Sequence, residues 1–337
     1  MHTKRAVLFV ATLALTTPGV AQTSDQPLRW FKGNTHAHTL NSDGDVTPDA
    51  LVTWYREQRY HFLVITDHNV VTPVEGLNAV HGAEQRFLVI RGEEVTDKVV
   101  ETAGEKTTEK PIHLNLLGGI GTVPPQGGDT PSGVLQRDID AMQKAGGVIQ
   151  INHPNFGWAM TASDLEATHG AQLIEVYNGH PQVNNAGGGG SPSAEALWDA
   201  MLTGGQQVFA AATDDTHNVK QPGVRDAGAP GRGWIVVRAR QLTQDAILDA
   251  LRRGDFYAST GVELSDIQAT PRALTVTVKP QSFARYTIQF IGRGGRVLKV
   301  ATSSPAQYDF AGDEGYVRAK VIDSMGYSAW TQAIRVK

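Results

Sequence analysis

The sequence contains no cysteine among its 337 residues. This absence excludes thiol catalysis, iron–sulfur clusters, disulfide-stapled folds and the cysteine-rich zinc modules. Basic residues are also outnumbered, with 30 Lys and Arg against 34 Asp and Glu, so no basic excess indicates a nucleic-acid-binding protein. The 40% of hydrophobic residues is enough for one large core, or for a large and a small one, and excludes a disordered chain.

Long apolar runs are lacking as well, apart from one at the N-terminus. Lys4 and Arg5 precede an apolar run over residues 6–15, and small residues follow it. This pattern is typical of a secretory signal peptide that is cleaved after Ala21, and the run is too short for a stable membrane span. We therefore expect a signal peptide over residues 1–21, a periplasmic or secreted protein, and no membrane span.

Short apolar runs alternate with helical patterns over the first three-quarters of the chain. The candidate strands are residues 30–36, 62–67, 87–94, 112–117, 147–153, 173–178, 207–214 and 234–238. Several are nearly continuous runs of Val, Ile, Leu and Phe, which favours parallel strands buried on both faces. Helix start and stop signals mark residues 51–60, 132–145, 193–203 and 243–254. The alternation favours an α/β barrel over an open sheet, although composition alone does not separate the two.

The pattern changes after Gly261, where apolar and polar residues alternate with a period of two. The segments are residues 274–278, 286–291, 297–300, 316–322 and 330–336. Such alternation predicts a small antiparallel β-sandwich over residues 262–337, after a barrel domain over residues 28–261. The predicted sandwich contains none of the 11 histidines, so we expect the chemistry in the barrel.

Histidine is the abundant metal-binding residue of this chain. Six of the 11 histidines fall at or beside candidate strand ends: His36, His38, His68, His113, His153 and His217. Any one of them could be a surface or capping histidine, and His113 lies near the start of its strand rather than the end. Residues two apart in an extended segment face the same side, which pairs His36 with His38 and Asp215 with His217. Because barrel sites gather at the carboxyl ends of strands, the sequence predicts a multinuclear metal site.

Three motifs carry a family resemblance. Asn34-Thr-His-Ala-His38, Asn41-Ser-Asp-Gly44 and Ile65-Thr-Asp-His68 occur in this order. Together they resemble the polymerase-and-histidinol-phosphatase (PHP) family of metallohydrolases, and most closely its exported carbaryl-hydrolase-like members. The resemblance extends from Trp30 to about Gly261. It implies a distorted β/α barrel that usually has seven strands, so that one of the eight candidates would be misassigned.

The resemblance also implies three metal positions. The first would use His36, His38, Glu94 and Asp215, the second Glu94, His113 and His153, and the third Asp43, His68 and His217. The family pattern Gly-x-Glu selects Glu94 over Glu93, and the Asp-x-His spacing selects Asp215 over Asp214. Asp67 and Asp214 are then expected either to orient imidazoles or to be solvated.

Six imidazoles and three carboxylates suit two or three divalent transition-metal ions, such as Zn, Mn or Fe, rather than Mg or Ca. Such ions activate a bridging water, so no protein nucleophile is needed. The resemblance implies hydrolysis of phosphate mono- or diesters. A carbamate, carboxyl ester or amide hydrolase with the same metal site is the alternative, and a non-catalytic metal-binding protein is a third possibility. The partner is expected to be a small-molecule substrate, not nucleic acid, and the sequence does not indicate the oligomeric state.

Contacts to the reacting groups are predicted from position alone. We expect His180 and Asp215 to be catalytic and Asn178 to contact substrate, because they lie at or just after strand ends. Arg225 and Arg232 lie in the Gly/Pro-rich loop after His217 and are expected either to contact substrate or to be solvated. Glycines 187–190 form either a lid or a surface loop. Trp158 and Trp234 could wall the pocket or pack in the core. The histidines expected at the surface are His61, His81 and His169.

Overall fold

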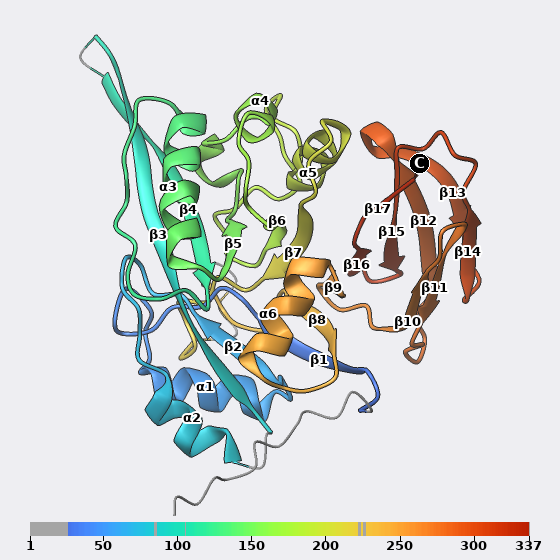
Figure 1. The fold of residues 1–337 in the computed structure, drawn as a ribbon, viewed down its shortest axis with the longest axis horizontal. Helices are drawn as coiled ribbons and strands as arrows, with labels where there is room; N and C mark the ends of the chain where they lie inside the picture. The colour runs from blue at the N-terminus through green and yellow to red at the C-terminus, as the bar shows by residue number, and fades with distance from the viewer. Residues whose placement is uncertain (1–25, 84–85, 105, 222–223, 225–226, 337) are drawn as a thin grey trace, which may run out of the picture.

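The computed structural model describes residues 26–83, 86–104, 106–221, 224 and 227–336. The predicted signal peptide over residues 1–21 lies outside them. The N-terminal part is a mixed sheet flanked by helices (Figure 1). Its strands are β1 (Arg29–Asn34), β2 (Phe62–Ile65), β3 (Leu88–Ala103), β4 (Lys106–Leu117), β5 (Val148–Ile151), β6 (Leu173–Asn178), β7 (Phe209–Thr213) and β8 (Trp234–Ala239).

These strands are hydrogen-bonded in the order β8-β1-β2-β3-β4-β5-β6-β7. Strands β1 to β3 are parallel to one another, as are β5 to β7, while β4 is antiparallel to both its neighbours and β8 is antiparallel to β1. Beyond the ends of β1 and β7, Ala37 and Thr216 form a parallel bridge. The segments that follow β1 and β7 therefore meet next to the histidines, which closes the distorted barrel on this side.

All eight predicted strands are present, so the expectation that one was misassigned is wrong. The expectation failed because two of the eight strands reverse direction, which the apolar runs alone do not reveal. The long β3–β4 hairpin projects away from the body of the molecule (Figure 1). Because β4 already begins at Lys106, His113 lies within it and not near its start as predicted. The reversed direction of β4 still brings His113 next to the carboxyl end of β5, where the Asn152 N–H donates to its carbonyl oxygen, and opposite Thr96 in the middle of β3.

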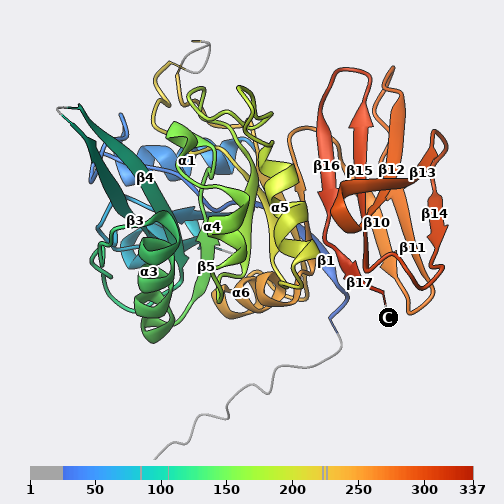
Figure 2. The same cartoon turned by 90° about the horizontal axis from the view of Figure 1, so that it is seen from above.

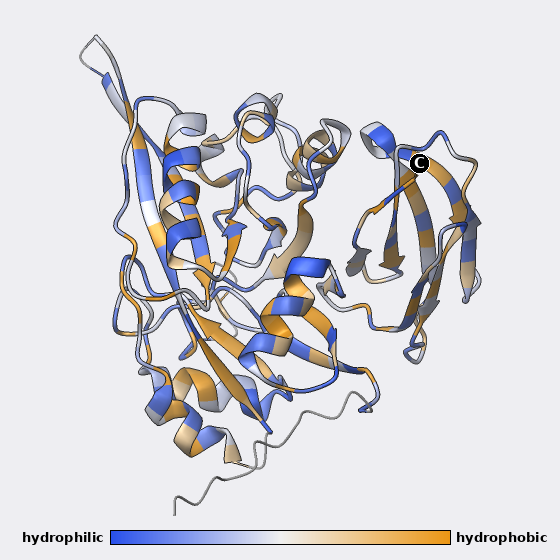
Figure 3. Cartoon of the chain, viewed as in Figure 1, coloured by the Kyte–Doolittle hydropathy of each residue, from blue (hydrophilic) through white to orange (hydrophobic). Residues whose placement is uncertain are grey.

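The principal helices are α1 (Pro48–Glu57), α3 (Pro131–Ala145), α5 (Ala194–Thr203) and α6 (Gln244–Arg253), with the shorter α2 (Glu75–His81), α4 (Ala162–Glu166) and η2 (Phe156–Trp158). At the start of each principal helix a Thr or Ser side chain at the N-cap accepts a backbone N–H. Helices α3, α5 and α6 begin within one residue of the predicted ranges, whereas α1 lies three residues earlier at both ends than the predicted 51–60. Their apolar faces pack on the largely apolar central strands, while polar faces point outward (Figure 3). No helix of the described ranges is long and apolar enough to cross a membrane.

The C-terminal part contains only strands and one short turn of helix, η3 (Arg293–Gly295). A three-stranded sheet is formed by β10 (Leu264–Ala269), β11 (Ala273–Val278) and β14 (Ala306–Asp309). Facing it are β12 (Tyr286–Gly292), β13 (Arg296–Ala301), β15 (Tyr316–Asp323), β16 (Ser328–Thr331) and β17 (Ile334–Arg335). The two sheets stack beside the N-terminal part (Figure 2). The predicted fold class, α/β followed by a small antiparallel sandwich, is confirmed.

One strand joins the two parts. Strand β9 (Phe256–Ser259) pairs with β8 on one side and with β16 on the other, so hydrogen bonding is continuous from the barrel into the C-terminal sheets. The sequence did not predict β9, nor β10 and β14. Strand β9 has only four residues, which gives too short an alternation to detect.

Candidate metal centre

The loops at the carboxyl ends of the strands surround one cavity of about 370 Å³. The structure brings together all nine predicted ligands there: His36, His38, Asp43, His68, Glu94, His113, His153, Asp215 and His217. They come from six separate strands or strand ends. Convergence of residues so distant in sequence at one barrel end is the arrangement that the strand-end argument predicts.

Glu94 lies at the middle of the cluster. Its Oε2 atom is 3.2 Å from His36 Nε2, 3.2 Å from His38 Nε2 and 3.1 Å from His68 Nδ1. Its Oε1 atom is 3.1 Å from His113 Nδ1 and 3.2 Å from His153 Nε2. One carboxylate therefore faces five imidazoles through both its oxygens, which is the position of a ligand shared between two ions.

Three atoms of this cluster are buried without a hydrogen-bond partner: His36 Nε2, His38 Nε2 and Glu94 Oε2. Glu94 Oε2 is 3.2 Å from each of the two imidazole nitrogens, yet their alignment does not make hydrogen bonds. Donor atoms about 2.0–2.1 Å from a tetrahedral zinc lie about 3.3–3.4 Å from each other. The unpartnered atoms thus have the spacing of ligand atoms around a common cation, and the residues present fit a metal site.

The hydrogen bonds of two histidines fix which ring nitrogen faces the cluster. His36 Nδ1 is 2.7 Å from Glu175 Oε1 and donates to it, so Nε2 keeps its lone pair toward Glu94 and Asp215. His217 Nδ1 is 2.9 Å from the carbonyl oxygen of Asp215. A carbonyl only accepts, so Nδ1 carries the proton and Nε2 is free to bind a metal.

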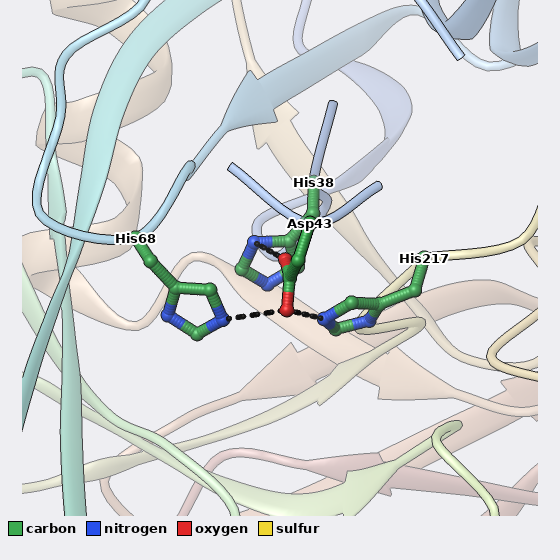
Figure 4. Close-up of side chains that lie close together, drawn as sticks. All are labelled: His38, Asp43, His68 and His217. Atoms are coloured by element: carbon green, nitrogen blue, oxygen red, sulfur yellow. Dashed lines mark ion pairs between the residues drawn. The ribbon is translucent and has the colours of Figure 1, made fainter. Parts of the chain in front are cut away.

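Asp43 reaches from the loop after β1 to the third group of ligands (Figure 4). Its Oδ2 is 3.4 Å from His68 Nε2 and 3.3 Å from His217 Nε2, while Oδ1 is 3.7 Å from His38 Nδ1. The Asp43 side chain is half exposed, unlike the buried Glu94. This group therefore stands at the mouth of the cavity, where exchange with solvent is easiest.

The structure forms four groups of possible metal ligands, and these groups share more residues with one another than the three predicted sets do. The clusters are His38 with Asp43, His68 and His217; His36 with His38 and Glu94; His36 with His153 and Asp215; and His68 with Glu94 and His113. His38 and His68 each face two of these groups through different ring nitrogens. The predicted partition among three metals thus differs from the geometry in two ways: these two rings are shared between groups, and His153 is grouped with His36 and Asp215 instead of with Glu94 and His113.

The imidazoles hold the central carboxylates ionised. Burial alone would raise the pKa of Glu94, but His36, His113 and His68 outweigh it and keep that pKa well below its ordinary value. The pKa of Asp215 is likewise well below its ordinary value, because His36, His38 and His217 outweigh the effect of burial. Ionised carboxylates are the form that binds divalent ions.

Two glycines of the sequence motifs allow close contacts between backbone segments, and these contacts place two of the candidate ligands. A Cβ on Gly44 would lie 2.5 Å from the carbonyl oxygen of His38, so glycine is needed to turn Asp43 back over the cluster. A Cβ on Gly92 would lie 2.7 Å from Val64 Cγ1 and 3.0 Å from the oxygen of Ile65. Glycine at that position lets β3 pack against β2 and so places Glu94.

The choices between neighbouring acids are clear from the geometry. Glu93 points away from the cluster and accepts the Val123 backbone N–H through Oε2 at 2.8 Å. Asp214 accepts from Tyr55 at 2.8 Å and from the backbone N–H of Arg232. Neither faces a metal-binding imidazole. Glu94 and Asp215 are the members of each pair that lie in the cluster.

The expectation that Asp67 and Asp214 orient imidazoles or are solvated is wrong. Both are fully buried. Asp67 accepts hydrogen bonds from Ser42, Thr72 and both the backbone and the side chain of Thr39. These bonds fix the loop that carries Asp43. Each acid thus anchors a loop rather than a histidine.

The imidazole-orienting carboxylate is Glu175, which sequence reasoning missed. Buried in β6, it accepts from His36 Nδ1 at 2.7 Å and from the backbone N–H of His153 at 2.6 Å. It also accepts from Thr213 Oγ1 at 2.7 Å and Asn178 Nδ2 at 2.8 Å. The available signal was an acid in an otherwise apolar strand, since such a carboxylate must be paired.

Of the residues predicted to be catalytic or to contact substrate, some line the cavity and others do not. His180 lines the cavity together with Asp215, Phe156 and Val183. Asn178 is buried and donates to Asp215 Oδ2 at 3.1 Å, so it positions a ligand instead of facing the cavity.

The guanidinium of Arg232 donates to the carbonyl oxygens of Gly179 and Val224 at 3.0 and 3.4 Å. It ties two loops together and is not part of the cavity wall. Arg225 lies outside the described residues. Glycines 187–190 form a bridged turn at Gly188 and Ser191 away from the cavity wall.

Other predictions about histidines and tryptophans have mixed outcomes. His81 is buried and 2.8 Å from Asp49, so its expected surface position is wrong, while His169 is exposed and His61 is half-buried. Trp158 is 40% exposed, and neither it nor Trp234 contributes to the cavity wall.

No protein-family model and no curated protein match this chain. A solved two-domain protein of Bacteroides vulgatus, described as containing a predicted PHP-like metal-dependent phosphoesterase, aligns over 92% of this chain and 95% of its own. It has 16% identity and a TM-score of 0.49.

Two further solved structures align with a smaller part of the chain. A proposed metal-dependent phosphoesterase of Bifidobacterium adolescentis covers 55% of this chain and 87% of its own, at 16% identity and a TM-score of 0.37. An amidohydrolase of Chromobacterium violaceum, with bound sulfate and no metal, covers 58% and 89%, at 17% identity and a TM-score of 0.38. At these identities and TM-scores, none of the three assigns a function to this chain.

Proposed function

We propose that this protein is a metal-dependent hydrolase of the PHP type that binds two or three divalent transition-metal ions. The observation that carries the proposal is the convergence of His36 Nε2, His38 Nε2 and Glu94 Oε2, buried and without hydrogen-bond partners, beside an open cavity. Buried polar atoms that lack partners are costly unless a ligand completes them. One cation bound between them would complete all three atoms at once.

The residues would hold Zn, Mn or Fe, which supply Lewis acidity and lower the pKa of a water. The chain's own groups then position the reactants. Glu175 and Asn178 hold His36 and Asp215 in place from behind. His180 accepts the backbone N–H of Gln182 through Nδ1 at 3.4 Å, so its Nε2 carries a proton. That N–H is available as a donor to a leaving oxygen in the cavity.

The substrate class that we propose first is a phosphate mono- or diester. Ligand groups at both the buried and the open side of the cluster could neutralise a phosphate and its leaving oxygen together. A carbamate, carboxyl ester or amide is the second candidate. It is favoured by the apolar side chains of Phe156 and Val183 in the cavity wall, which would accept an aryl or alkyl group.

We also propose that the protein is exported to the periplasm or secreted. This rests on the basic start, apolar run and small residues before Gln22 in the sequence. Intact-mass analysis of protein from the exported fraction should give a chain that begins at Gln22. A chain that keeps Lys4 and Arg5 would contradict export by this route.

The test of the enzymatic proposal is a substrate panel. Protein with its metal content measured is assayed with p-nitrophenyl phosphate, bis-p-nitrophenyl phosphate, p-nitrophenyl acetate and 1-naphthyl N-methylcarbamate, before and after chelation. We expect about two or more transition ions per chain and turnover of a phosphate ester that chelation abolishes.

Three other outcomes are informative. Turnover of only the acetate or the carbamate would replace the phosphoesterase assignment by the second candidate. Tight metal binding with no turnover of any substrate would favour a non-catalytic metal-binding protein. Fewer than one ion per chain would contradict the metal centre itself.

A further inference from the structure

A second cavity, of about 490 Å³, lies between the N-terminal barrel and the C-terminal sheets. We call it the seam cleft and define it by Trp30, Lys32, His61, Trp234, Tyr257 and Lys279. Lys32 belongs to β1, whose far end leads to His36 and the metal centre. Among the residues that the structure describes, the two cavities have no wall residue in common, so the seam cleft is a separate feature.

The Lys32 ammonium group enters this cleft without an anionic partner. Its Nζ lies 3.8 Å from the ring centroid of Trp234 and 3.9 Å from that of Tyr60. Among the described residues, no carboxylate forms an ion pair with it. Burial lowers the pKa of Lys32 to about 8, against the opposing effect of Asp214 and Glu263. The ring faces therefore stabilise a cation that has lost part of its hydration and lacks a counter-ion.

The neighbouring polar groups are also donors. His61 Nδ1 accepts the backbone N–H of Lys32 at 3.0 Å, so His61 Nε2 carries the proton. Burial, together with the positive charges of Arg29 and Lys32, lowers the pKa of His61. Glu263, the one acid among the described wall residues, is paired with Lys279 at 2.6 Å. The cleft is thus locally cationic in a chain whose net charge is −4.

The remaining wall is aromatic. The Trp30 and Trp234 side chains are half-buried, and Tyr257 is buried with its ring 5.4 Å from that of Trp30 in an edge contact. The Trp30 indole N–H and the Tyr257 hydroxyl are hydrogen-bonded to the backbone, which fixes these two rings. Rigid apolar walls with a few donors are the composition of a small-molecule site.

We propose that the seam cleft binds a flat, apolar molecule that carries one carboxylate, sulfonate or phosphate group. The acidic group would lie against Lys32 Nζ and the His61 Nε2–H, and the apolar body against Trp30 and Trp234. An anion at this position supplies the missing counter-ion of Lys32. The inference does not depend on the hydrolase function.

Calorimetric titration of the full-length, metal-loaded protein with 2-naphthoate tests the proposal, with neutral 2-naphthamide as the matched ligand. Lys32→Met keeps the length of the side chain between the two rings and removes its charge. We expect 2-naphthoate to bind about tenfold or more weakly to this variant, as for loss of a charge-assisted hydrogen bond. Lys32→Arg and the exposed control Lys144→Met should bind as the parent does.

The parent protein should bind 2-naphthamide about tenfold or more weakly than 2-naphthoate. Trp234→Leu should weaken binding of both. No binding of 2-naphthoate, equal binding of the two ligands, or equal affinity in Lys32→Met would each overturn the proposal. If Lys32→Met does not fold, the naphthoate–naphthamide comparison on the parent and on Trp234→Leu still decides. Hydrolytic turnover, followed in parallel, should be the same in Lys32→Met and the parent.

Discussion

The barrel and the C-terminal sheets bury different chemistry. Behind the metal centre the barrel interior is a polar network, in which Thr35 donates to Gln150 at 2.8 Å and Asn152 donates to Asn115 at 2.8 Å. Asn152 also donates to Glu94 Oε1 at 2.9 Å. The core between the C-terminal sheets is aliphatic and aromatic, built around Leu274, Val276, Ile288, Phe290, Val317 and Val321.

The buried polar groups of the barrel lower its stability in exchange for a functional site. Burying amides and carboxylates destabilises a protein unless every group finds a partner. The barrel meets that requirement only in part, since His36 Nε2, His38 Nε2 and Glu94 Oε2 have no hydrogen-bond partner where the nine candidate ligands converge. The C-terminal sheets have no such requirement and are packed for stability. Changes in the barrel interior should therefore alter the metal centre, and changes near the C-terminal sheets should alter stability.

The largest expected effect comes from Glu94→Gln. An amide cannot serve as an anionic ligand shared by two ions, so metal content should fall and turnover should be abolished. Metal analysis and the substrate panel measure both. The matched control is Glu93→Gln, whose side chain faces the Val123 backbone instead of the cluster. If Glu93→Gln were the more damaging change, the roles of these two neighbours would have to be exchanged.

Glu175→Gln should have the next largest effect. The neutral amide could still accept some of the hydrogen bonds but would not stabilise the Nδ1–H form of His36, so metal affinity should fall about 10–100-fold. Competition with a fluorescent chelator measures the affinity. Thermal unfolding of the metal-free protein separates this effect from a general loss of packing. Unchanged affinity in a folded variant would show that the polar network is structural only.

The sequence was sufficient for the parts of the site that lie at strand ends. His36, His38, His153 and His217 are visible because an apolar strand stops and a ligand type follows. Glu94 and Asp215 needed the period-two rule or the family pattern to separate them from Glu93 and Asp214. Local sequence also predicted the principal helices, since their caps act over three residues.

What sequence reasoning missed depends on long-range pairing. The direction of β4 and the position of His113 within it follow from the hairpin with β3, which no local pattern specifies. Glu175 contacts His36 across 139 residues of sequence, and β9 is recognised only by its partners β8 and β16. The roles assigned to Asp67 and Asp214 failed for a related reason, because most of their partners are hydroxyl and backbone N–H groups of other segments, such as Thr39 for Asp67 and Tyr55 for Asp214.

A substitution where the C-terminal sheets contact helix α5 tests whether this part of the molecule affects stability alone. Arg318 of β15 donates to both oxygens of Asp199 on α5, at 2.9 and 2.6 Å, and is buried there. Arg318→Met leaves Asp199 without its buried cation, so we expect a loss of about 3–5 kcal/mol in the free energy of unfolding. The exposed pair of Lys98 and Glu109 supplies the control, because Lys98→Met should cost less than about 1 kcal/mol.

Chemical denaturation measures both losses in stability. In the folded Arg318→Met protein, metal content and turnover at low temperature should equal those of the parent. A change in either would mean that the C-terminal sheets also position the metal centre, and the contrast between the two regions would break.

The smallest expected effect is a change in the pH dependence of stability. Asp138 of α3 is buried, with Oδ1 accepting the Gln126 N–H at 2.9 Å and Oδ2 unpartnered. Burial raises its pKa to about 7 from an ordinary value of 3.8. Between these two values the folded state holds a proton that the unfolded state releases. Stability should therefore fall as the pH rises from about 4 to about 7, and then level off.

Asp138→Asn removes this titration, so the metal-free variant should lose less stability than the parent between pH 5 and pH 8, by about 1–3 kcal/mol. Part of the slope should remain, because burial also raises the pKa of Glu93 to about 7. The exposed Asp140 of the same helix gives the control Asp140→Asn, which should leave the slope unchanged.

In the C-terminal sheets, Glu314 accepts two backbone N–H groups and the Tyr308 hydroxyl, which outweigh burial and lower its pKa. Its contribution has the opposite sign, since it is lost only as the pH falls through that lowered pKa. If Asp138→Asn kept the full slope, the incompletely partnered acids of the barrel would not be the source of the pH dependence.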